Sequence, residues 1–464
     1  MRSFAPLALV ALSLGCASKA PVATSLKPAQ IAERNKPGTV LVMIKHSANV
    51  TVPKDTVMVP GSQQRLVAAI RSRVRPGMNQ QEAVALVFDE LLGNWRLYLQ
   101  PVGRRTIPAS ITSVGSGFFV TPDGYAVTNA HVVGGDEKEL KTQFAQKALG
   151  SLLDEAVTDV SKSLGQLSEE QRKKLVAVAA QFYVENMSFD SVQRDASLLT
   201  GVGQAGMGTL SKPIPVEIVK NAVGEPIPGK DVAVVKANGQ NFPTLKLGED
   251  KDLKTGDEIY PFGFPADATF YPSFDPSSAT EPSFTRGVVS ARKTMAGGWE
   301  VIQTDAAIRG GNSGGPVLNE KGEVIGLATF GLIDQKSGAS AQGANFVVPA
   351  AIVREILGRA NVTPSDSPVS KDWIEAQDEM DASHYKTAMT KFDEIETLHP
   401  GMPAVAAAKS RAATAIREGK DASGSIVLPI AIGGGVFVVV AAVAGAFLAG
   451  RRRGSAGSAP PRVG

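Results

Sequence analysis

Residues 115–133 read GSGFFVTPDGYAVTNAHVV, and this stretch decides the fold class that we expect. Two runs rich in β-branched and aromatic residues, 115–120 and 125–128, flank Pro122-Asp123-Gly124. Because Pro-Asp-Gly is a strong turn signal, the stretch predicts two strands joined by a hairpin. A histidine, His131, follows the second run after two residues.

The same pattern of short apolar runs, separated by glycine, proline and aspartate, extends from 213 to 348. Residues 39–44 (TVLVMI) predict a further buried strand near the beginning. This spacing of short strands is typical of an all-β barrel or sandwich. Within the second half, 311–316 (GNSGGP) places Ser313 in a glycine-rich segment.

The composition excludes several classes of protein. A chain of 464 residues with 43% hydrophobic residues is too apolar to be disordered, and at ~150 residues per domain it predicts two or three structured units. A single cysteine excludes an intramolecular disulfide framework and a Cys-rich zinc module. With 48 basic and 45 acidic residues the net charge is +3, so we expect no nucleic-acid partner. The sequence implies no metal and no organic cofactor.

Two segments with helical periodicity interrupt the β pattern, at 50–110 and 138–212. In the first, Asn79 and Glu82 form an N-cap pair that opens a helix. In the second, apolar residues recur near a 3.6-residue period and Ser168 opens a capping box. We therefore expect 138–200 to be an inserted helical hairpin.

The region after the β pattern also reads as helical. Residues 358–370 predict a linker, and 371–420 resemble one tetratricopeptide (TPR) unit followed by a helix. Because a single repeat cannot bury its own apolar face, two alternatives remain. The helices are a module that binds a protein partner at 371–418, or they are a cap packed on the rest of the chain.

The beginning of the chain has the pattern of an export signal. Residues 1–17 combine Arg2, a short apolar run and a small-residue end. Cys16 lies where a bacterial lipoprotein signal would be cut and lipidated, although Ser13 replaces the usual leucine. The alternative is an ordinary cleaved signal. Residues 18–36 predict a polar linker.

The end of the chain predicts a membrane anchor. Residues 426–450 carry no charge, and Arg451-Arg452-Arg453 follows. As a helix, the run would reach ~37 Å against a hydrocarbon core of ~30 Å. The arginines predict a cytoplasmic tail at 451–464 and an extracytoplasmic location, periplasmic or at the cell surface, for everything before 426.

The motifs resemble those of the trypsin-like serine proteases, most closely the bacterial HtrA/Deg branch. The resemblance covers about residues 37–357, apart from the two inserted segments. It is carried by 128–133 (TNAHVV) and 311–316 (GNSGGP). Two further matching segments, 231–236 (DVAVVK) and 303–308 (QTDAAI), lie between these two motifs. It implies a mainly β, double-barrel fold with helical insertions. The PDZ domain usual in that branch is not expected, because only 358–425 separate the barrels from the predicted span.

The resemblance also implies a catalytic triad of His131, Asp231 and Ser313. A serine hydroxyl is a weak nucleophile and needs a base within ~3 Å. A histidine, with a reference pKa of ~6.5, can take that proton and return it to the leaving amine. An aspartate orients the imidazole. Gly311, Asn312 and Ser313 form the implied oxyanion hole, in which the backbone N–H groups of Gly311 and Ser313 face the developing negative charge.

Two further expectations concern the loops around Ser313. Arg309-Gly310 replaces the Asn-Pro usual in this branch, which predicts a mobile loop in the absence of substrate. By resemblance, the pocket for the substrate side chain is walled by Ile308 and by 327–331, which include Ala328, Thr329, Phe330 and Gly331. The main chain of 329–331 is expected to pair with the substrate as an added strand. No carboxylate lies at the pocket base, so we expect small to medium aliphatic side chains to be preferred.

The sequence therefore predicts a membrane-tethered, extracytoplasmic serine endopeptidase that acts on unfolded or exported polypeptides, as a single chain or a homo-oligomer. The alternative is a catalytically inactive envelope scaffold or chaperone that recruits partners through its helical segments. For the hairpin at 138–200 we consider a lid or partner surface at the cleft, and a peripheral decoration remote from it.

Overall fold

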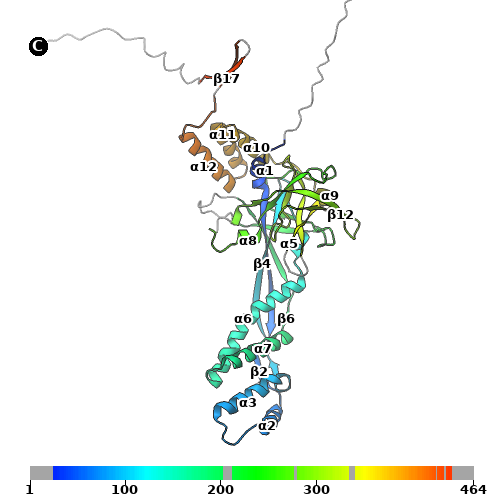
Figure 1. Cartoon of the computed structure of the whole chain (residues 1–464), viewed down its shortest axis with the longest axis vertical. Coiled ribbons are helices and arrows are strands. Elements are labelled where there is room, and N and C mark those ends of the chain that lie inside the picture. The colour runs from blue at the N-terminus through cyan, green and yellow to red at the C-terminus, as the bar shows by residue number, and fades with distance from the viewer. Residues whose placement is uncertain are drawn as a thin grey trace, which may run out of the picture.

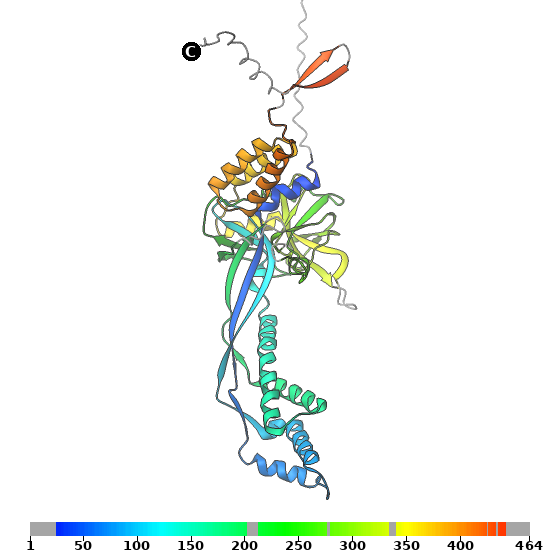
Figure 2. The ribbon, with the colours of Figure 1, turned by 90° about the vertical axis from the view of Figure 1, so that its left-hand side faces the viewer.

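The structure is a computed structural model that describes residues 25–201, 212–275, 279–333, 340–424, 426–432 and 435–441. The predicted signal with Cys16 and the tail at 451–464 lie outside these residues. Two β-barrels occupy the middle of the molecule, a long helical projection leaves them on one side, and a group of helices covers them on the opposite side (Figures 1 and 2).

Six antiparallel strands close the first barrel. In ring order they are β1, β4, β5, β9, β8 and β7, and β7 pairs again with β1. The predicted hairpin is β4–β5, in which Phe118 pairs with Val127, and Gly124 takes the left-handed φ of 105° that its turn requires. The strands are β1 (Thr39–Val52), β4 (Arg105–Phe119), β5 (Tyr125–Thr128), β7 (Gln193–Thr200), β8 (Ile214–Val223) and β9 (Ala233–Ala237), and β6 (Ser188–Phe189) pairs with the far end of β1.

The second barrel closes in the same way. Its ring order is β10, β12, β13, β16, β15 and β14, with β14 pairing back to β10. The strands are β10 (Glu258–Gly263), β12 (Gly287–Thr294), β13 (Glu300–Thr304), β14 (Pro316–Leu318), β15 (Val324–Ile333) and β16 (Ser340–Pro349), and β11 (Ser283–Phe284) lies beside β10. Helix α9 (Ala350–Arg359) follows β16, and its Val353 and Leu357 share one buried cluster with Phe118 of the first barrel and Tyr260 of the second. This common core holds the two barrels together.

Strands β1 and β4 continue beyond the first barrel as a two-stranded ribbon. They stay paired from Thr39↔Phe118 to Val52↔Arg105, whereas β7 accompanies β1 only as far as Ser47. Because two strands alone are marginally stable in water, the ribbon needs a cover. Helix α6 (Glu137–Leu164) supplies it by burying one apolar face against the ribbon. The buried residues in this contact are Ala48, Val50, Val52, Ala109, Leu140, Phe144, Ala148 and Leu152.

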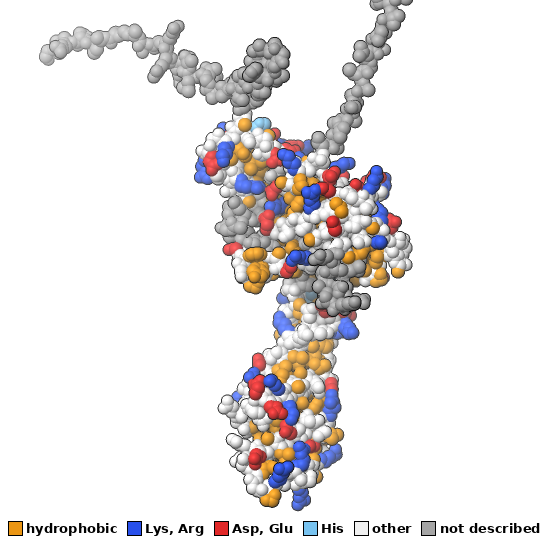
Figure 3. Space-filling view, in the orientation of Figure 1, with side chains coloured by type: hydrophobic (Ala, Val, Ile, Leu, Met, Phe, Trp, Pro, Cys, Tyr) orange, Lys and Arg blue, Asp and Glu red, His pale blue; other side chains and the backbone are white. Residues whose placement is uncertain are grey.

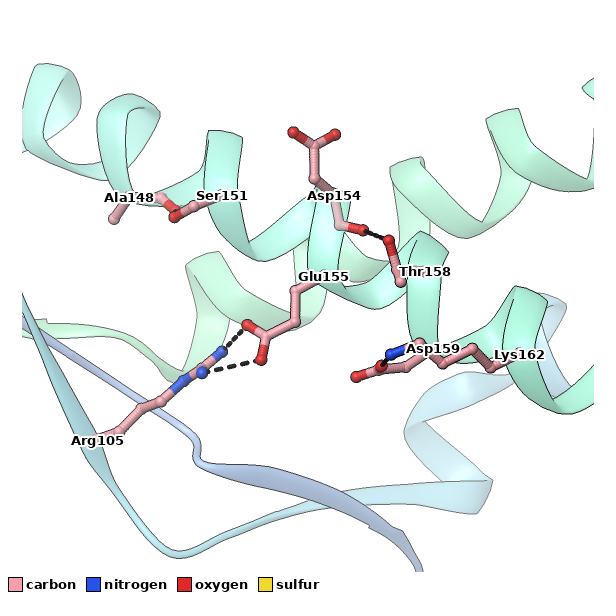
Figure 4. Close-up of polar contacts among 8 residues, drawn as sticks. All are labelled: Arg105, Ala148, Ser151, Asp154, Glu155, Thr158, Asp159 and Lys162. Carbon is pink, nitrogen blue, oxygen red and sulfur yellow. Dashed lines mark hydrogen bonds and ion pairs between the residues drawn. The ribbon is translucent and has the colours of Figure 1, made fainter.

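An ion pair marks the far end of this contact. Arg105, at the start of β4, points toward α6 and forms a bidentate ion pair with Glu155 (Figure 4). The pair raises the pKa of Arg105 and lowers the pKa of Glu155 by direct hydrogen bonding. Since both side chains are partly exposed, we regard the pair as fixing the register of α6 on the ribbon rather than as a large contribution to stability.

The two inserted segments form one unit, which we call the lobe and define as residues 48–109 and 136–192. It contains the hairpin β2 (Asp55–Met58)–β3 (Leu99–Val102) and the helices α2 (Ser62–Arg71), α3 (Gln80–Gly93), α4 (Trp95–Tyr98), α6 and α7 (Glu169–Asn186). Phe88 and Leu92 of α3 pack on Leu175 of α7, and Trp95 meets Phe182 edge-on at 5.5 Å. The predicted capping boxes at Asn79 and Ser168 open α3 and α7.

The boundary expected for the second insertion is wrong. The inserted helices end at Asn186, and 193–200, expected to be helical, are barrel strand β7. In this strand Ala196 and Leu198 point into the barrel core, an alternation that favours a strand. Helix α6 runs along the ribbon away from the barrels (Figures 1 and 2), and α7 packs against α6 and α3 within the lobe. This arrangement favours the peripheral role over a lid.

Three helices follow the barrels and have a core of their own. They are α10 (Pro368–Asp381), α11 (Tyr385–Leu398) and α12 (Pro403–Arg417), and Trp373 and Phe392 lie at the centre of their shared cluster. His399 packs against Phe242 of the first barrel with 5.3 Å between ring centroids, and Ser370 Oγ accepts a hydrogen bond from Thr244 N at 2.6 Å. The helices are therefore docked on the barrels, as the cap alternative expects.

Both predicted linkers are shorter than expected. Within 18–36 the chain forms α1 (Pro28–Asn35), followed by a 3₁₀ turn, η1 (Lys36–Gly38), and in the other linker only 360–367 lie between α9 and α10. Helix α1 was missed because Ile31 is its only large apolar residue, too few for a periodic signal. Contacts with other elements stabilise the helix despite its weak sequence signal. Ile31 is fully buried, and Glu33 O accepts a hydrogen bond from Trp373 Nε1 at 2.8 Å.

The helix expected over 426–450 is not found. Residues Ile426–Ile432 and Gly435–Ala441 form an antiparallel hairpin, β17–β18, and 442–450 lie outside the described residues. The sequence offers a physical reason, because these runs are rich in β-branched valine and isoleucine and contain Pro429, which removes a helical N–H. Within the described ranges, no helix has the length and apolar character needed to cross a membrane.

Candidate active site

Strand register brings His131 and Asp231 together. Strands β5 and β9 are neighbours in the first barrel, with Thr128 opposite Ala233, and each functional side chain lies just beyond the paired end of its strand. His131, in the short helix α5 (Ala130–Gly134), has its Nδ1 atom 2.7 Å from Asp231 Oδ2. The backbone N–H of His131 donates to Asp231 Oδ1 at 2.9 Å. Both carboxylate oxygens therefore bind the same histidine.

The carboxyl group of Asp231 is fully buried, and its environment compensates for that burial. A buried carboxylate is costly unless it accepts hydrogen bonds. Besides the two bonds from His131, Oδ2 accepts one from the Thr329 hydroxyl at 2.7 Å. The backbone carbonyl of Asp231 accepts a further bond from Asn129 Nδ2 at 2.5 Å. The aspartate is thus fixed in position on both its side chain and its main chain.

Ser313 lies on the loop between β13 and β14 and is 8% exposed. Its hydroxyl donates to the backbone carbonyl of Thr329 at 2.9 Å, and in the described part of the chain it makes no hydrogen bond with His131. Thr329, on β15, therefore contacts the other two members of the site: its side chain binds Asp231 and its carbonyl binds Ser313. The structure joins His131 to Asp231 directly and Ser313 to Asp231 through Thr329.

The loop around Ser313 depends on glycines. Gly311 has a φ of 97° and Gly314 a φ of 85°, values that L side chains rarely adopt. A Cβ at Gly311 would lie 2.4 Å from Phe264 O, and one at Gly314 would lie 2.3 Å from Ser116 O. At both positions the main chains approach too closely for any side chain.

This loop leaves two backbone donors free. Among the described residues, the N–H groups of Gly311 and Ser313 have no acceptor. The N–H of Asn312, by contrast, donates to Arg309 O at 3.0 Å. Of the three residues predicted for the oxyanion hole, Asn312 therefore has no backbone donor available, while the other two do.

Ser116 on β4 fixes the loop from the first barrel. Its hydroxyl donates to Gly311 O at 2.7 Å and accepts from Phe264 N at 2.8 Å. Its backbone N–H donates to Ser313 O at 2.8 Å, and its carbonyl accepts from the Thr128 hydroxyl at 2.7 Å. One fully buried serine thus connects the loop, the second barrel and the strand that leads to His131.

The same loop is also tied to helix α8 (Ala266–Thr269). Gly310 O accepts a hydrogen bond from Ala266 N at 2.7 Å, and the Arg309 guanidinium lies 2.9 Å from Asp267 Oδ2. The ion pair is largely exposed, so it contributes little to stability by itself. The expected mobility of this loop stays a prediction.

The predicted pocket residues divide into two groups. Ile308 and Ala328 belong to the apolar core of the second barrel and are only 8% and 1% exposed, so little of either side chain is left for a ligand to touch. Thr329, Phe330 and Gly331 lie along β15, where the Thr329 hydroxyl is already occupied by Asp231. In the part of the chain that the structure describes, no group of three His, Cys, Asp or Glu residues is placed to hold a metal.

Three roles were not assigned from the sequence: those of Asn129, Ser116 and the Thr329 side chain. Asn129 and Ser116 belong to motifs that we quoted, but only His131 in those motifs carries an obvious chemical signal. No sequence pattern pointed to the Thr329 hydroxyl, because only the fold brings β15 close to Asp231, which lies just before β9.

In a comparison with known proteins, residues 115–327 match the model of a family described as the trypsin-like peptidase domain. A protein of Pseudomonas putida called a probable periplasmic serine endoprotease DegP-like is 37% identical over 150 residues, which are 32% of this chain and 28% of the relative. A protein of the same name from Ectopseudomonas mendocina is 25% identical over 316 residues, 67% of this chain and 46% of the relative. The chain thus spans less than half the length of these relatives.

Among solved structures, the HtrA-type protease AlgW with decapeptide aligns at 18% identity and a TM-score of 0.36, over 72% of this chain and 68% of that one. At this TM-score the similarity of the two whole chains is weak. By its matched segment and these relatives, the chain is similar to trypsin-like serine endoproteases.

Proposed function

We propose that this protein is a serine endopeptidase in which Ser313 is the nucleophile, His131 the general base and Asp231 the residue that orients it. The observation that carries the proposal is the buried Asp231 carboxylate held against His131 Nδ1, beside a serine flanked by two free backbone N–H groups. Few arrangements other than acyl transfer require both an oriented imidazole and unpaired amides next to one hydroxyl.

In this proposal each atom has a task. Because Nδ1 faces a carboxylate, it carries the proton, and Nε2 is left with a lone pair that can accept the Ser313 proton. Ser313 Oγ must first leave the Thr329 carbonyl to which it donates. It then attacks the peptide carbonyl, and the N–H groups of Gly311 and Ser313 donate to the resulting oxyanion. Asp231 stays ionised and stabilises the imidazolium.

An active-site probe tests this proposal. A fluorophosphonate should label the wild-type protein, and Ser313→Ala and His131→Ala should abolish labelling. His384→Ala is the matched control, because His384 lies at the start of α11, outside the barrels, and is paired with Glu379. A wild-type protein that is folded by circular dichroism but unlabelled would refute the proposal.

One observation favours the second candidate, an inactive protease-fold scaffold or chaperone. The Ser313 hydroxyl donates to Thr329 and not to His131, an arrangement that a non-catalytic serine can also adopt. In that case α10–α12, as a TPR-like surface, would bind the partner. The same probe separates the two candidates, since a scaffold is not labelled.

We further propose that the substrates are unfolded or exported polypeptides, cleaved after small to medium aliphatic residues in quality control or processing. The lack of any acidic side chain at Ala307 and Ile308 supports the aliphatic preference. Cleavage profiling that returned mainly arginine or lysine at this position would contradict it.

We propose an extracytoplasmic location, supported by the signal pattern at 1–17 and by relatives that are called periplasmic. Attachment by a lipid on Cys16 is part of this proposal. Metabolic labelling with a fatty-acid analogue should mark the wild type and not Cys16→Ser. Equal labelling of both would exclude Cys16, and no labelling would favour an ordinary cleaved signal.

A further inference from the structure

Three aromatic side chains distinguish one edge of the barrels. Among the described residues, the exposed large apolar side chains of the barrels are Phe270, Tyr271 and Phe274, at 47%, 53% and 54% exposure. The others lie on the lobe, except for Leu398 on α11. Figure 3 shows hydrophobic side chains at the left edge of the barrel region, close to where Figure 1 labels α8. We call these three residues the aromatic patch.

The patch is displayed by a structured turn. Phe270 N donates to Ala266 O at 3.0 Å, and Phe274 N donates to Tyr271 O at 2.9 Å. The rings of Tyr271 and Phe274 lie 5.2 Å apart. Because burial of an aromatic ring away from water is favourable, a fixed display of three half-exposed rings needs an explanation.

The patch is also continuous with the candidate active site. The residues just before it, Ala266 and Asp267, bind Gly310 O and the Arg309 guanidinium at 2.7 and 2.9 Å. A Cβ on Gly311 would lie 2.5 Å from Ala266 N, so the two loops are in direct contact. A chain bound at Ser313 would therefore need to extend only a few residues to reach the patch.

We propose that the aromatic patch is a docking site for an apolar segment of the polypeptide substrate, outside the residues around the scissile bond. This inference rests on the proposed function and deepens it, because it selects substrates that are long and expose apolar side chains. A substrate held at two points benefits from a raised effective concentration at the second. The patch should therefore lower KM for unfolded proteins and leave the chemistry of short peptides unchanged.

Charge and area argue against other occupants. Residues 264–285 contain no lysine or arginine, and Arg309 and Lys36 beside them are ion-paired with Asp267 and Glu281, so these two basic groups are already paired and poorly suited to bind an anionic membrane. Three half-exposed rings, each burying roughly 150–250 Å² at most, fall short of the ~800 Å² per partner that a stable dimer needs. A flexible apolar segment of a substrate needs neither a basic surface nor a large contact area, so it fits the aromatic patch.

The test compares two substrates and two triple variants. The patch variant is F270S/Y271S/F274S, and its matched control is V67S/V74S/L97S, which removes three similarly exposed apolar side chains from the lobe. The substrates are a short fluorogenic peptide and β-casein, an unfolded protein. We expect the patch variant to raise KM for β-casein by about tenfold with kcat retained, from lost apolar contact, and to hydrolyse the short peptide like wild type. The control variant should match wild type on both.

A binding measurement keeps the inference separate from the proposed function. Fluorescence anisotropy of labelled β-casein on Ser313→Ala protein requires no catalysis, and adding the patch substitutions should weaken this binding by a similar factor. Unchanged affinity and unchanged KM would overturn the inference. So would a patch variant that loses self-association in light scattering while still binding β-casein, because the patch would then contact a second copy of the chain. If wild type is never labelled by fluorophosphonate, the proposed function fails, and anisotropy still decides whether the patch binds substrate.

Discussion

The hydroxyl of Thr329 donates to Asp231 Oδ2 at 2.7 Å, while the carbonyl of the same residue accepts from Ser313 Oγ at 2.9 Å. Thr329 thus lies between the buried aspartate and the serine and restrains both. In the proposed mechanism its side chain acts through Asp231, as a positioning residue.

Removing that hydroxyl should slow turnover. Thr329→Val keeps the shape and leaves Asp231 Oδ2 with one hydrogen bond fewer, and a bond to a charged group is worth about 1.5–3 kcal/mol. We expect kcat for a peptide substrate to fall by about tenfold or more. Thr329→Ser restores the donor and should restore most of kcat. If Thr329→Val and Thr329→Ser have the same kcat, the hydroxyl does not position Asp231.

Gly311 should not tolerate a side chain, whereas the neighbouring Gly310 should. Gly311→Ala introduces a Cβ within 2.5 Å of Phe264 O and Ala266 N at a left-handed φ, so we expect lost labelling by fluorophosphonate and a lower Tm. Gly310→Ala is the control, because a Cβ there has no neighbour within 4 Å. Equal labelling of the two variants would show that the loop adjusts freely.

Ser116 should be needed for the loop as well as for stability. Ser116→Ala leaves Phe264 N and Gly311 O without a partner, at a cost of about 1–3 kcal/mol for each buried group. We expect both the urea midpoint and kcat to fall. Ser113→Ala, on the same strand, removes a hydroxyl that contacts His46 instead, and it should lower the urea midpoint without lowering kcat. A normal kcat for Ser116→Ala would contradict this role.

The lobe should be dispensable for peptide hydrolysis. Ser47 pairs with Ser110, so a two-residue Asn-Gly turn can replace 48–109. Arg194 Nε donates to Gly134 O at 2.9 Å, so a short linker can replace 136–192. We expect the shortened protein to be folded by circular dichroism and to retain kcat/KM for a short peptide. A shortened protein that is folded but inactive would instead support the alternative that the hairpin is a lid on the cleft.

Acid should destabilise the protein partly through His46. This residue is buried, its Nε2 lies 2.9 Å from Ser113 Oγ, and its Nδ1 has no partner among the described residues. Burial and, secondarily, the charge of Arg194 lower the pKa of His46. The unfolded chain therefore takes up a proton near pH 6.5 that the folded chain resists, and stability is lost as the pH falls below that value.

The His46→Gln variant isolates this contribution. Glutamine can keep a hydrogen bond to Ser113 but does not titrate. The Tm difference between wild type and His46→Gln, measured at pH 8 and at pH 5.5, should shift in favour of the variant at the lower pH. An identical difference at both values would show that His46 does not contribute.

The sequence was sufficient where the signal is local. The turn at Pro122-Asp123-Gly124 and the caps at Asn79 and Ser168 were predicted because a few adjacent residues determine them. The pairing of His131 with Asp231 followed from the motif resemblance and agrees with their 2.7 Å contact.

The failures arose where distant segments decide the structure. Packing of Phe88 on Leu175 unites two insertions that had looked independent, and no periodicity within either insertion reveals it. Helix α1 exists because Ile31 is buried by other elements. At 426–441, overall apolarity suggested a membrane helix, whereas the β-branched side chains and Pro429 are compatible with the hairpin that the structure contains.

Strand β4 contains Arg105 at one end, which forms an ion pair with Glu155 of α6. Near its other end it contains Ser116, which donates a hydrogen bond to Gly311 O. The lobe and the loop that carries Ser313 are therefore both held by one continuous β-strand. Because β4 pairs with β1 from Arg105 to Phe118, these two contacts are held in a fixed register relative to each other.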